Sequence, residues 1–407
     1  MTLIEYFTES HIDNIAACLR LQPKIMVMVG NATEMGEPIK RYKKLLKQRG
    51  IPTKVTMCDV QRMDLGEIYA ALKKVILEAH DCVIDLTGGD ECSIMAVGAV
   101  LAELPPEARQ RIRVEKYDHE AGIVRDCIND NRKVPTTAPS LSVSELIALH
   151  GGVLHPNSYQ PPADCNRRDL TGLWDIVSEA PKDWNRAIML LSEFESRSDS
   201  KMQVFLPLSS LHNGISNFES KETSVRDLLD KLQQKGIIDD QSNRNVLEYT
   251  YLSQILRYCT QKAGNVLEVK TLLEGRAIVE NGKPYFNDCQ MSVGIDWDGV
   301  VHDPMDHIPE TRNEIDVVLM HGTTPLFISC KNGNIGEEEL YKLHTVTERF
   351  GGLYAKKMLI ATDLDRKSPS ANRSFIQRAW DMDIYLVTDA AELSGGEWAQ
   401  IFKKAMQ

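Results

Sequence analysis

The stretch that decides the fold runs from Arg312 to Asn332 and reads Arg-Asn-Glu-Ile-Asp-Val-Val-Leu-Met-His-Gly-Thr-Thr-Pro-Leu-Phe-Ile-Ser-Cys-Lys-Asn. Its two apolar runs, separated by turn-forming residues at 321–325, predict a β-hairpin. Asp316 begins the first apolar run and Lys331 ends the second, so the turn can bring both to one end of a sheet. Burying a carboxylate and an ammonium group there is costly unless they bind something, and a metal ion together with a phosphate would satisfy both.

Four short motifs follow one another in and after this hairpin: Asn-Glu-Ile-Asp-Val at 313–317, Ser-Cys-Lys at 329–331, Leu-Tyr-Lys-Leu at 340–343 and Gly-Gly-Leu at 351–353. Their order resembles the nuclease core of the PD-(D/E)xK superfamily and, more narrowly, the nucleases fused to CRISPR-associated Rossmann-fold (CARF) sensors. The family pattern has Glu two residues before the Lys, where this chain has Ser329. A hydroxyl group is a weaker ligand for a hard cation than a carboxylate.

The resemblance implies a divalent metal site, with Mn²⁺ or Mg²⁺ as the cofactor. Asp316 would be the central ligand, joined by the main-chain carbonyl of Cys330 and by Glu268 from a helix that precedes the hairpin. Glu314 shares the strand face of Asp316, because alternate residues of a strand point the same way, and is a second candidate acid. The predicted catalytic residues are Asp316, Lys331, Glu268, Glu314 and Ser329. Taken alone, the hairpin pair could equally be an ion pair at a sheet edge.

Length and composition bound the class of protein. The 407 residues suffice for two or three domains, and 43% hydrophobic with 26% charged residues is typical of a globular protein. No run approaches the roughly 18 to 20 apolar residues of a membrane span, and no signal peptide is evident, so we expect a cytoplasmic protein without membrane contact. The net charge of −11 argues against a general nucleic-acid coat, but a nuclease needs only a local basic groove.

The first 150 residues predict a Rossmann-like domain, and the resemblance to CARF proteins implies that this domain is a ligand sensor. Oily strands at 2–7, 24–30, 54–58, 82–86 and 112–117 alternate with helices at 11–21, 37–49, 65–79 and 92–104. Such strands indicate a parallel sheet covered on both faces, and ligands of these sheets lie beyond the carboxyl ends of the strands.

The loop after the fourth strand is Asp-Leu-Thr-Gly-Gly at 85–89, where two glycines allow the backbone to approach a ligand. Taken alone, this loop is better explained as a tight turn that binds nothing. Together with the nuclease hairpin, it resembles the ligand loop of CARF domains. The resemblance implies a homodimer that holds one cyclic oligoadenylate, cyclic tetra-adenylate by family analogy, across its two-fold axis. The predicted ligand-binding residues are Ser10, Asn31, Thr87, Gly88 and Gly89.

Residues 151–250 predict a linker that resembles a winged helix, with a helix at 224–236 and a two-stranded wing up to residue 251. Without a basic recognition helix, we interpret it as a structural spacer rather than a DNA-docking module. Residues 251–407 predict a restriction-endonuclease-like α/β domain that opens with one long helix at 251–273 and carries Glu268.

The leading hypothesis is therefore a dimeric, cyclic-oligoadenylate-activated, metal-dependent nuclease of type III CRISPR defence. DNA and RNA, chiefly single-stranded, are its expected substrates. One alternative is a nuclease-inactive cyclic-nucleotide sensor, in which Ser329 marks a lost metal site. The other is a winged-helix transcription regulator, which would bind duplex DNA without cutting it.

Overall fold

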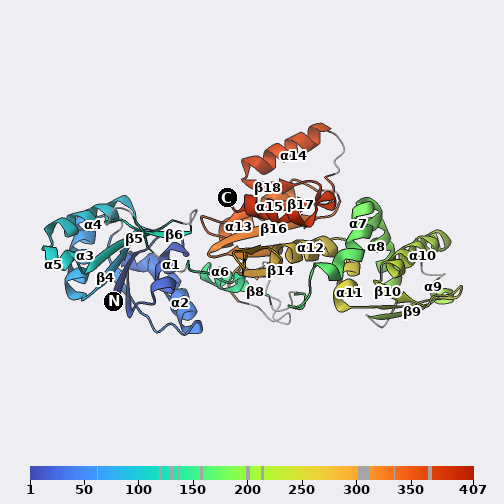
Figure 1. Ribbon diagram of the computed structural model, residues 1–407, viewed down its shortest axis with the longest axis horizontal. Coiled ribbons are helices and arrows are strands. Elements are labelled where there is room, and N and C mark those ends of the chain that lie inside the picture. The colour runs from blue at the N-terminus through green and yellow to red at the C-terminus, as the bar shows by residue number, and fades with distance from the viewer. Residues whose placement is uncertain are drawn as a thin grey trace.

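The computed structural model describes residues 1–61, 63–118, 122–128, 132–134, 138–155, 159–198, 202–211, 215–300, 312–333, 335–364 and 369–407. Three units follow one another along the long axis of the molecule (Figure 1). We call them the N-terminal unit (1–134), the middle unit (167–261) and the C-terminal unit (265–407 together with the strand at 153–154), and the C-terminal unit lies between the other two. Within the described ranges, no helix has the length and apolar character that crossing a membrane requires.

A seven-stranded sheet forms the N-terminal unit, in the order β3-β2-β1-β4-β5-β6-β7. The first five strands pair in parallel, and β6 and β7 join antiparallel. The elements are β1 (Thr2–Tyr6), α1 (Asp13–Leu21), β2 (Ile25–Gly30), α2 (Ala32–Gln48), β3 (Lys54–Asp59), α3 (Leu65–Glu78), β4 (Cys82–Asp85), α4 (Glu91–Glu103), α5 (Pro106–Arg109), β5 (Ile112–Asp118), β6 (Ile123–Asp126) and β7 (Lys133–Val134). The alternation of strand and helix is as predicted, because consecutive apolar residues of these strands are buried on both faces.

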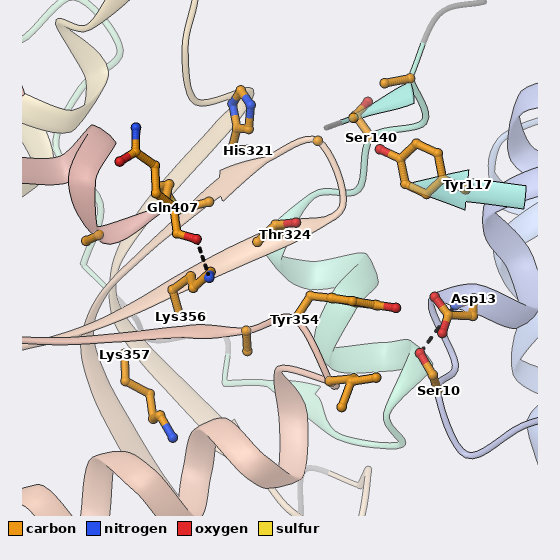
Figure 2. Close-up of a pocket in the computed structure, with 18 of the residues that line it drawn as sticks. Ser10, Asp13, Tyr117, Ser140, His321, Thr324, Tyr354, Lys356, Lys357 and Gln407 are labelled. Atoms are coloured by element: carbon orange, nitrogen blue, oxygen red, sulfur yellow. Dashed lines mark hydrogen bonds between the residues drawn. The ribbon is translucent and has the colours of Figure 1, made fainter. Parts of the chain in front are cut away.

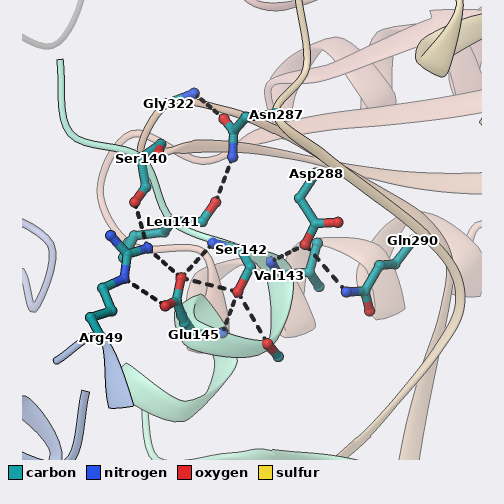
Figure 3. A network of polar contacts seen from close by, with 11 residues as sticks. Arg49, Ser140, Leu141, Ser142, Val143, Glu145, Asn287, Asp288, Gln290 and Gly322 are labelled. Atoms are coloured by element: carbon teal, nitrogen blue, oxygen red, sulfur yellow. Dashed lines mark hydrogen bonds and ion pairs between the residues drawn. The ribbon is translucent and has the colours of Figure 1, made fainter. Parts of the chain in front are cut away.

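Helix α6 (Val143–Leu149) connects the N-terminal unit with the C-terminal unit (Figure 3). It begins at Ser142, whose hydroxyl accepts a hydrogen bond from the Glu145 N–H (3.3 Å), while the Glu145 carboxylate accepts one from the Ser142 N–H (2.8 Å). Arg49, just beyond α2, donates to the same carboxylate at 2.6 Å. From the C-terminal unit, Asn287 Nδ2 donates to the main-chain carbonyl that precedes the cap (2.8 Å). The connection is therefore hydrogen-bonded to both neighbours.

The middle unit packs helices around a three-stranded sheet of order β10-β11-β9. Its elements are η1 (Arg167–Leu170), α7 (Thr171–Glu179), α8 (Pro181–Glu195), β9 (Gln203–Pro207), α9 (Leu208–Leu211), α10 (Phe218–Gln234), β10 (Ile238–Asp240), β11 (Val246–Tyr251) and α11 (Gln254–Gln261). Helix α10 followed by the β10–β11 pair gives the predicted order of helix and wing. Its role as a spacer stays a prediction.

A six-stranded sheet of order β18-β17-β16-β15-β14-β8 forms the C-terminal unit. Strands β14, β15 and β16 are antiparallel, and β16, β17 and β18 are parallel. The elements are β8 (Val153–Leu154), α12 (Asn265–Arg276), β12 (Val279–Glu280), β13 (Lys283–Pro284), β14 (Asp288–Asp296), β15 (Arg312–His321), β16 (Thr324–Lys331), α13 (Glu338–Phe350), β17 (Lys356–Ala361), α14 (Pro369–Asp381), β18 (Ile384–Val387), η3 (Ala390–Glu392) and α15 (Gly395–Ala405).

This sheet contributes to two different hydrophobic cores, one on each face. Alternate side chains of β15, such as Val317 and Leu319, join the core that contains α12, α15 and the middle unit. The intervening ones, such as Val318 and Met320, join the core that contains α13, α6 and helices α1 and α2 of the N-terminal unit. The C-terminal unit therefore shares buried apolar surface with both neighbours.

Four local predictions differ from the structure. The helix expected at 251–273 is two helices, since α11 ends at Gln261 and α12 begins at Asn265. The hairpin turn is shorter than 321–325, because His321 pairs with Thr324 around a two-residue turn in which Gly322 has φ +62°. The helix expected from residue 37 starts at Ala32, and β8, inside the predicted linker, pairs with β14.

Candidate functional site

The β15–β16 hairpin places Asp316 beside the Ser-Cys-Lys sequence, as predicted. Val317 pairs with Ile328 at the last rung of the hairpin, so Asp316 lies level with Ser329. Asp316 Oδ2 accepts hydrogen bonds from the Cys330 N–H (2.6 Å) and from the Ser329 hydroxyl (3.2 Å). These two donors fix the orientation of the carboxylate, and Ser329 acts here as a support for Asp316.

Lys331 lies between two carboxylates. Its Nζ is 3.7 Å from Asp316 Oδ2 and 3.0 Å from Glu339 Oε2. Burial alone would lower the pKa of Lys331, but the charges of Asp316 and Glu339 outweigh burial and raise this pKa above its ordinary value. Glu339 was not among the predicted site residues. Its signal, a run of glutamates at 337–339 at the start of α13, is what any helix N-terminus favours and so did not stand out.

Glu268 lies on α12, within electrostatic reach of the hairpin residues. Burial, followed by the charges of Asp316 and Glu314, raises the pKa of Glu268 to about 8, against the opposing charge of Lys331. Glu314 itself is exposed on β15. The structure thus gathers the five predicted catalytic residues around one end of the hairpin, where acidic groups outnumber cationic ones.

Strand β14 is distorted where it faces Asp316. Met291 pairs with Val317 and Val293 pairs with Ile315, so the residue between them, Ser292, lies opposite Asp316. Ser292 has φ +48°, in the left-handed region that residues with a side chain seldom adopt. Sequence patterns gave no sign of this distortion, because serine is common in strands and turns alike.

The oxygen groups around Asp316 suit a hard cation that keeps several water ligands better than one enclosed by protein side chains. Among the described residues, no three His, Cys, Asp or Glu side chains converge closely enough to enclose a metal ion. Asp316 and Glu268 nevertheless offer two carboxylates, and Mg²⁺ or Mn²⁺ is commonly held by one or two carboxylates with water filling the remaining positions. Of the two groups that Cys330 could offer, the thiol is buried and lies 3.4 Å from Thr271 Oγ1. The main-chain carbonyl is therefore the group of Cys330 that suits a hard cation.

A cleft of about 2080 Å³ separates the loops of the N-terminal unit that carry Ser10 and residues 87–89 from the C-terminal unit (Figure 2). Four of the five predicted ligand-binding residues line it: Ser10, Thr87, Gly88 and Gly89. The prediction for Asn31 differs, since Asn31 does not line the cleft. Its side chain caps α2 by accepting a hydrogen bond from the Thr33 N–H (2.9 Å).

Close packing explains why the ligand loop needs glycine. A Cβ at Gly88 would lie 3.0 Å from Thr8 Cγ2 and 3.1 Å from the Tyr6 carbonyl oxygen. The Thr87 hydroxyl is used internally, because it donates to Asp85 Oδ1 (2.5 Å) and accepts from the Tyr117 N–H (2.9 Å). Main-chain groups and Ser10 are therefore better placed than the Thr87 side chain to contact a ligand.

The fold and these two sites define a class of protein, namely a Rossmann-like domain joined to a restriction-endonuclease-like domain. Residues 257–395 match the family model described as "Card1-like, endonuclease domain". This match bears out the predicted endonuclease.

Solved structures share the fold over nearly the whole chain. Protein VC1899 from Vibrio cholerae aligns with a TM-score of 0.72 at 16% identity, covering 100% of this chain and 97% of that one. Can2 from Sulfobacillus thermosulfidooxidans, solved in complex with cyclic tetra-adenylate, aligns with a TM-score of 0.64 at 15% identity, with coverages of 100% and 97%.

A third structure, described as a type III CRISPR defence DNA nuclease activated by cyclic oligoadenylate, gives a TM-score of 0.50 at 15% identity, covering 91% of this chain and 46% of that one. No curated protein sequence matches the chain. The mixed α/β fold and the resemblance to sensor–nuclease fusions are thereby confirmed.

Proposed function

We propose that this protein is a metal-dependent nuclease that a cyclic oligoadenylate activates, and that it acts in type III CRISPR defence in the cytoplasm. The arrangement of Asp316, Glu268 and Lys331 at the hairpin end carries this proposal, because two acids and a lysine gathered at one place suit phosphodiester hydrolysis. The substrates are DNA and RNA, chiefly single-stranded.

Each residue of the site has a distinct part in the reaction. Asp316 and Glu268, with the Cys330 carbonyl, would hold Mn²⁺ or Mg²⁺. Such a cation lowers the pKa of bound water and neutralises charge on the phosphate. Lys331 holds a phosphate oxygen or the attacking water, and Ser329 keeps the Asp316 carboxylate in its orientation. Glu314 lies further out on the same strand and suits a contact through water.

The proposed activator is cyclic tetra-adenylate, bound at Ser10 and the loop at 87–89. A ring with two-fold symmetry suits a homodimer in which each copy supplies one set of loops. Exposed apolar side chains beside the loop support a second copy: Ile94 (49% exposed) and Met95 (60%) on α4, with Met63 (62%) near them. Apolar groups gathered on a surface in this way favour protein contact.

Cleavage of labelled single-stranded DNA and RNA tests the proposal. We expect Mn²⁺-dependent cleavage that rises when cyclic tetra-adenylate is added, and loss of cleavage in Asp316→Ala. Cleavage that ignores the activator, or that survives this substitution, would contradict the proposal. Calorimetric titration with Mn²⁺ separates the inactive-sensor alternative, which predicts no metal binding that depends on Asp316.

A further inference from the structure

Helix α13 has one end at the candidate active site and the other at the ligand cleft. At its N-terminal end, Glu339 contacts Lys331 at 3.0 Å. At its C-terminal end, the turn at 352–354 lines the cleft. The helix has 13 residues, so the two ends are separated by about 20 Å.

The turn after the C-terminal end of α13 lies against Ile12 and His150. Gly352 has φ +76°, and a Cβ there would lie 3.3 Å from Ile12 Cδ1 and 3.4 Å from His150 Nε2. Ile12 follows Ser10, another of the predicted ligand-binding residues, by two positions. From the same turn, the Tyr354 side chain extends across the cleft toward Ser10 (Figure 2). A ligand that fills this space would therefore meet both the N-terminal loops and the turn after α13.

The buried face of α13 lies in the same hydrophobic core as helix α1. This core contains Phe350 and Leu343 of α13 together with Ile12 and Ile15 from the N-terminal unit. Protein interiors are close-packed, so a shift of α1 is passed to its neighbours and is not absorbed in empty space. Ile12 and α13 thus belong to one core, and their closest approach lies at Gly352, just after the helix.

At the N-terminal end, Glu339 holds Lys331 more closely than Asp316 does, at 3.0 Å compared with 3.7 Å. Each of the two paired side chains, Lys331 and Glu339, is 26% exposed, so solvent screens this pair only in part. An ammonium group that is paired with a helix carboxylate is less able to hold a phosphate oxygen. The observed pairing suits a resting state of the enzyme.

We propose that α13 couples the two sites: Glu339 restrains Lys331 in the ligand-free protein, and a ligand in the cleft shifts α13 so that Lys331 is released toward the substrate phosphate. Glu339 is a positioning residue in this scheme, since it acts through Lys331. The inference rests on the proposed function and adds its regulation. A ligand can shift such an equilibrium only if it binds the released state more tightly, and the turn at 352–354 supplies contacts that can differ between the two states.

The test compares Glu339→Gln with Glu338→Gln in the full-length protein. Glu338 precedes Glu339 on the same helix and is exposed, so its substitution removes the same charge away from Lys331. Mn²⁺-dependent cleavage without activator should rise in Glu339→Gln by at least about 5-fold, the lower end of typical coupling between sites. The further increase on adding cyclic tetra-adenylate should shrink correspondingly, and Glu338→Gln should match the wild type in both measurements.

The affinity for cyclic tetra-adenylate is a second measurement, and it would not change if Glu339 had only a structural role. Because coupling between sites is reciprocal, Glu339→Gln should bind cyclic tetra-adenylate more tightly than the wild type in calorimetry, and Glu339→Asp should restore much of the restraint. An unchanged activation ratio and affinity in Glu339→Gln would overturn the inference, as would loss of cleavage in the presence of activator. If cyclic tetra-adenylate fails to activate the wild type, the proposed function fails. Unactivated cleavage of the two variants then still decides whether Glu339 restrains Lys331.

Discussion

Asp85 lies at the end of β4, directly beneath the candidate ligand loop, and its titration should change the stability of the protein. Burial raises the pKa of Asp85 to about 6 from 3.8, although hydrogen bonds from Thr87 oppose the shift. An acid whose pKa is higher in the folded state binds its proton more tightly there. The folded protein therefore carries a penalty that is absent below pH 3.8, grows between the two values and is complete above about pH 6.

Asp85→Asn should remove this penalty, because the amide oxygen can still accept both hydrogen bonds from Thr87. The free energy of unfolding of the variant, relative to the wild type, should be greater at about pH 7.5 than at about pH 4 by up to about 3 kcal/mol. Urea unfolding of both proteins at the two pH values measures this difference. Asp81→Asn is the matched control, since Asp81 is exposed just before the same strand. A difference that does not change with pH would contradict the assignment.

Single residues show how far sequence reasoning reaches at the candidate site. Asp316 and Lys331 could be predicted because strand and turn patterns fix which ends of a hairpin meet. The contact between Glu339 and Lys331 could not be predicted, because it depends on the residue at which α13 begins. Asn31 was predicted to bind ligand but caps a helix, because the same side-chain chemistry serves both purposes.

At the scale of elements, the N-cap of α6 should contribute measurably to stability. The Ser142 hydroxyl accepts a hydrogen bond from the Glu145 N–H, and α6 is the element through which two units are connected (Figure 3). Ser142→Ala should lower the free energy of unfolding by about 1 kcal/mol, as is typical for loss of an N-cap. Chemical denaturation gives the value, with Ser220→Ala, at an exposed position within α10, as the control. Equal losses in both variants would show that the cap itself contributes nothing.

Elements with a strong apolar pattern could be predicted from sequence, and those decided by distant contacts could not. The N-terminal strands and helices agree within a few residues, because burial on both faces leaves a continuous apolar signal. The break between α11 and α12 carries only one glycine as a signal, and Gly264 is tolerated inside many helices. Strand β8 has two residues, and only its pairing with β14 defines it.

At the scale of the whole molecule, the two shared cores imply that the three units unfold together. Apolar side chains of the C-terminal sheet alternate between a core shared with the middle unit and a core shared with the N-terminal unit. Separating any unit would therefore expose a face that is now buried, and exposed apolar area is the main cost of such an opening. Ligand binding at the N-terminal loops should then raise the free energy of unfolding of all three units.

Native-state hydrogen exchange measured at increasing denaturant concentration tests this cooperativity. Amides of β2 in the N-terminal unit and of β16 in the C-terminal unit should converge on one free energy of opening, because their side chains share a core. The short β12–β13 pair, whose four residues are exposed, should exchange by local fluctuation at much lower free energy and serves as the internal control. Separate plateaus for β2 and β16 would show that the N-terminal unit opens by itself. The core that Ile12 shares with Phe350 of α13 would then be too weak to carry a signal from the cleft to Lys331.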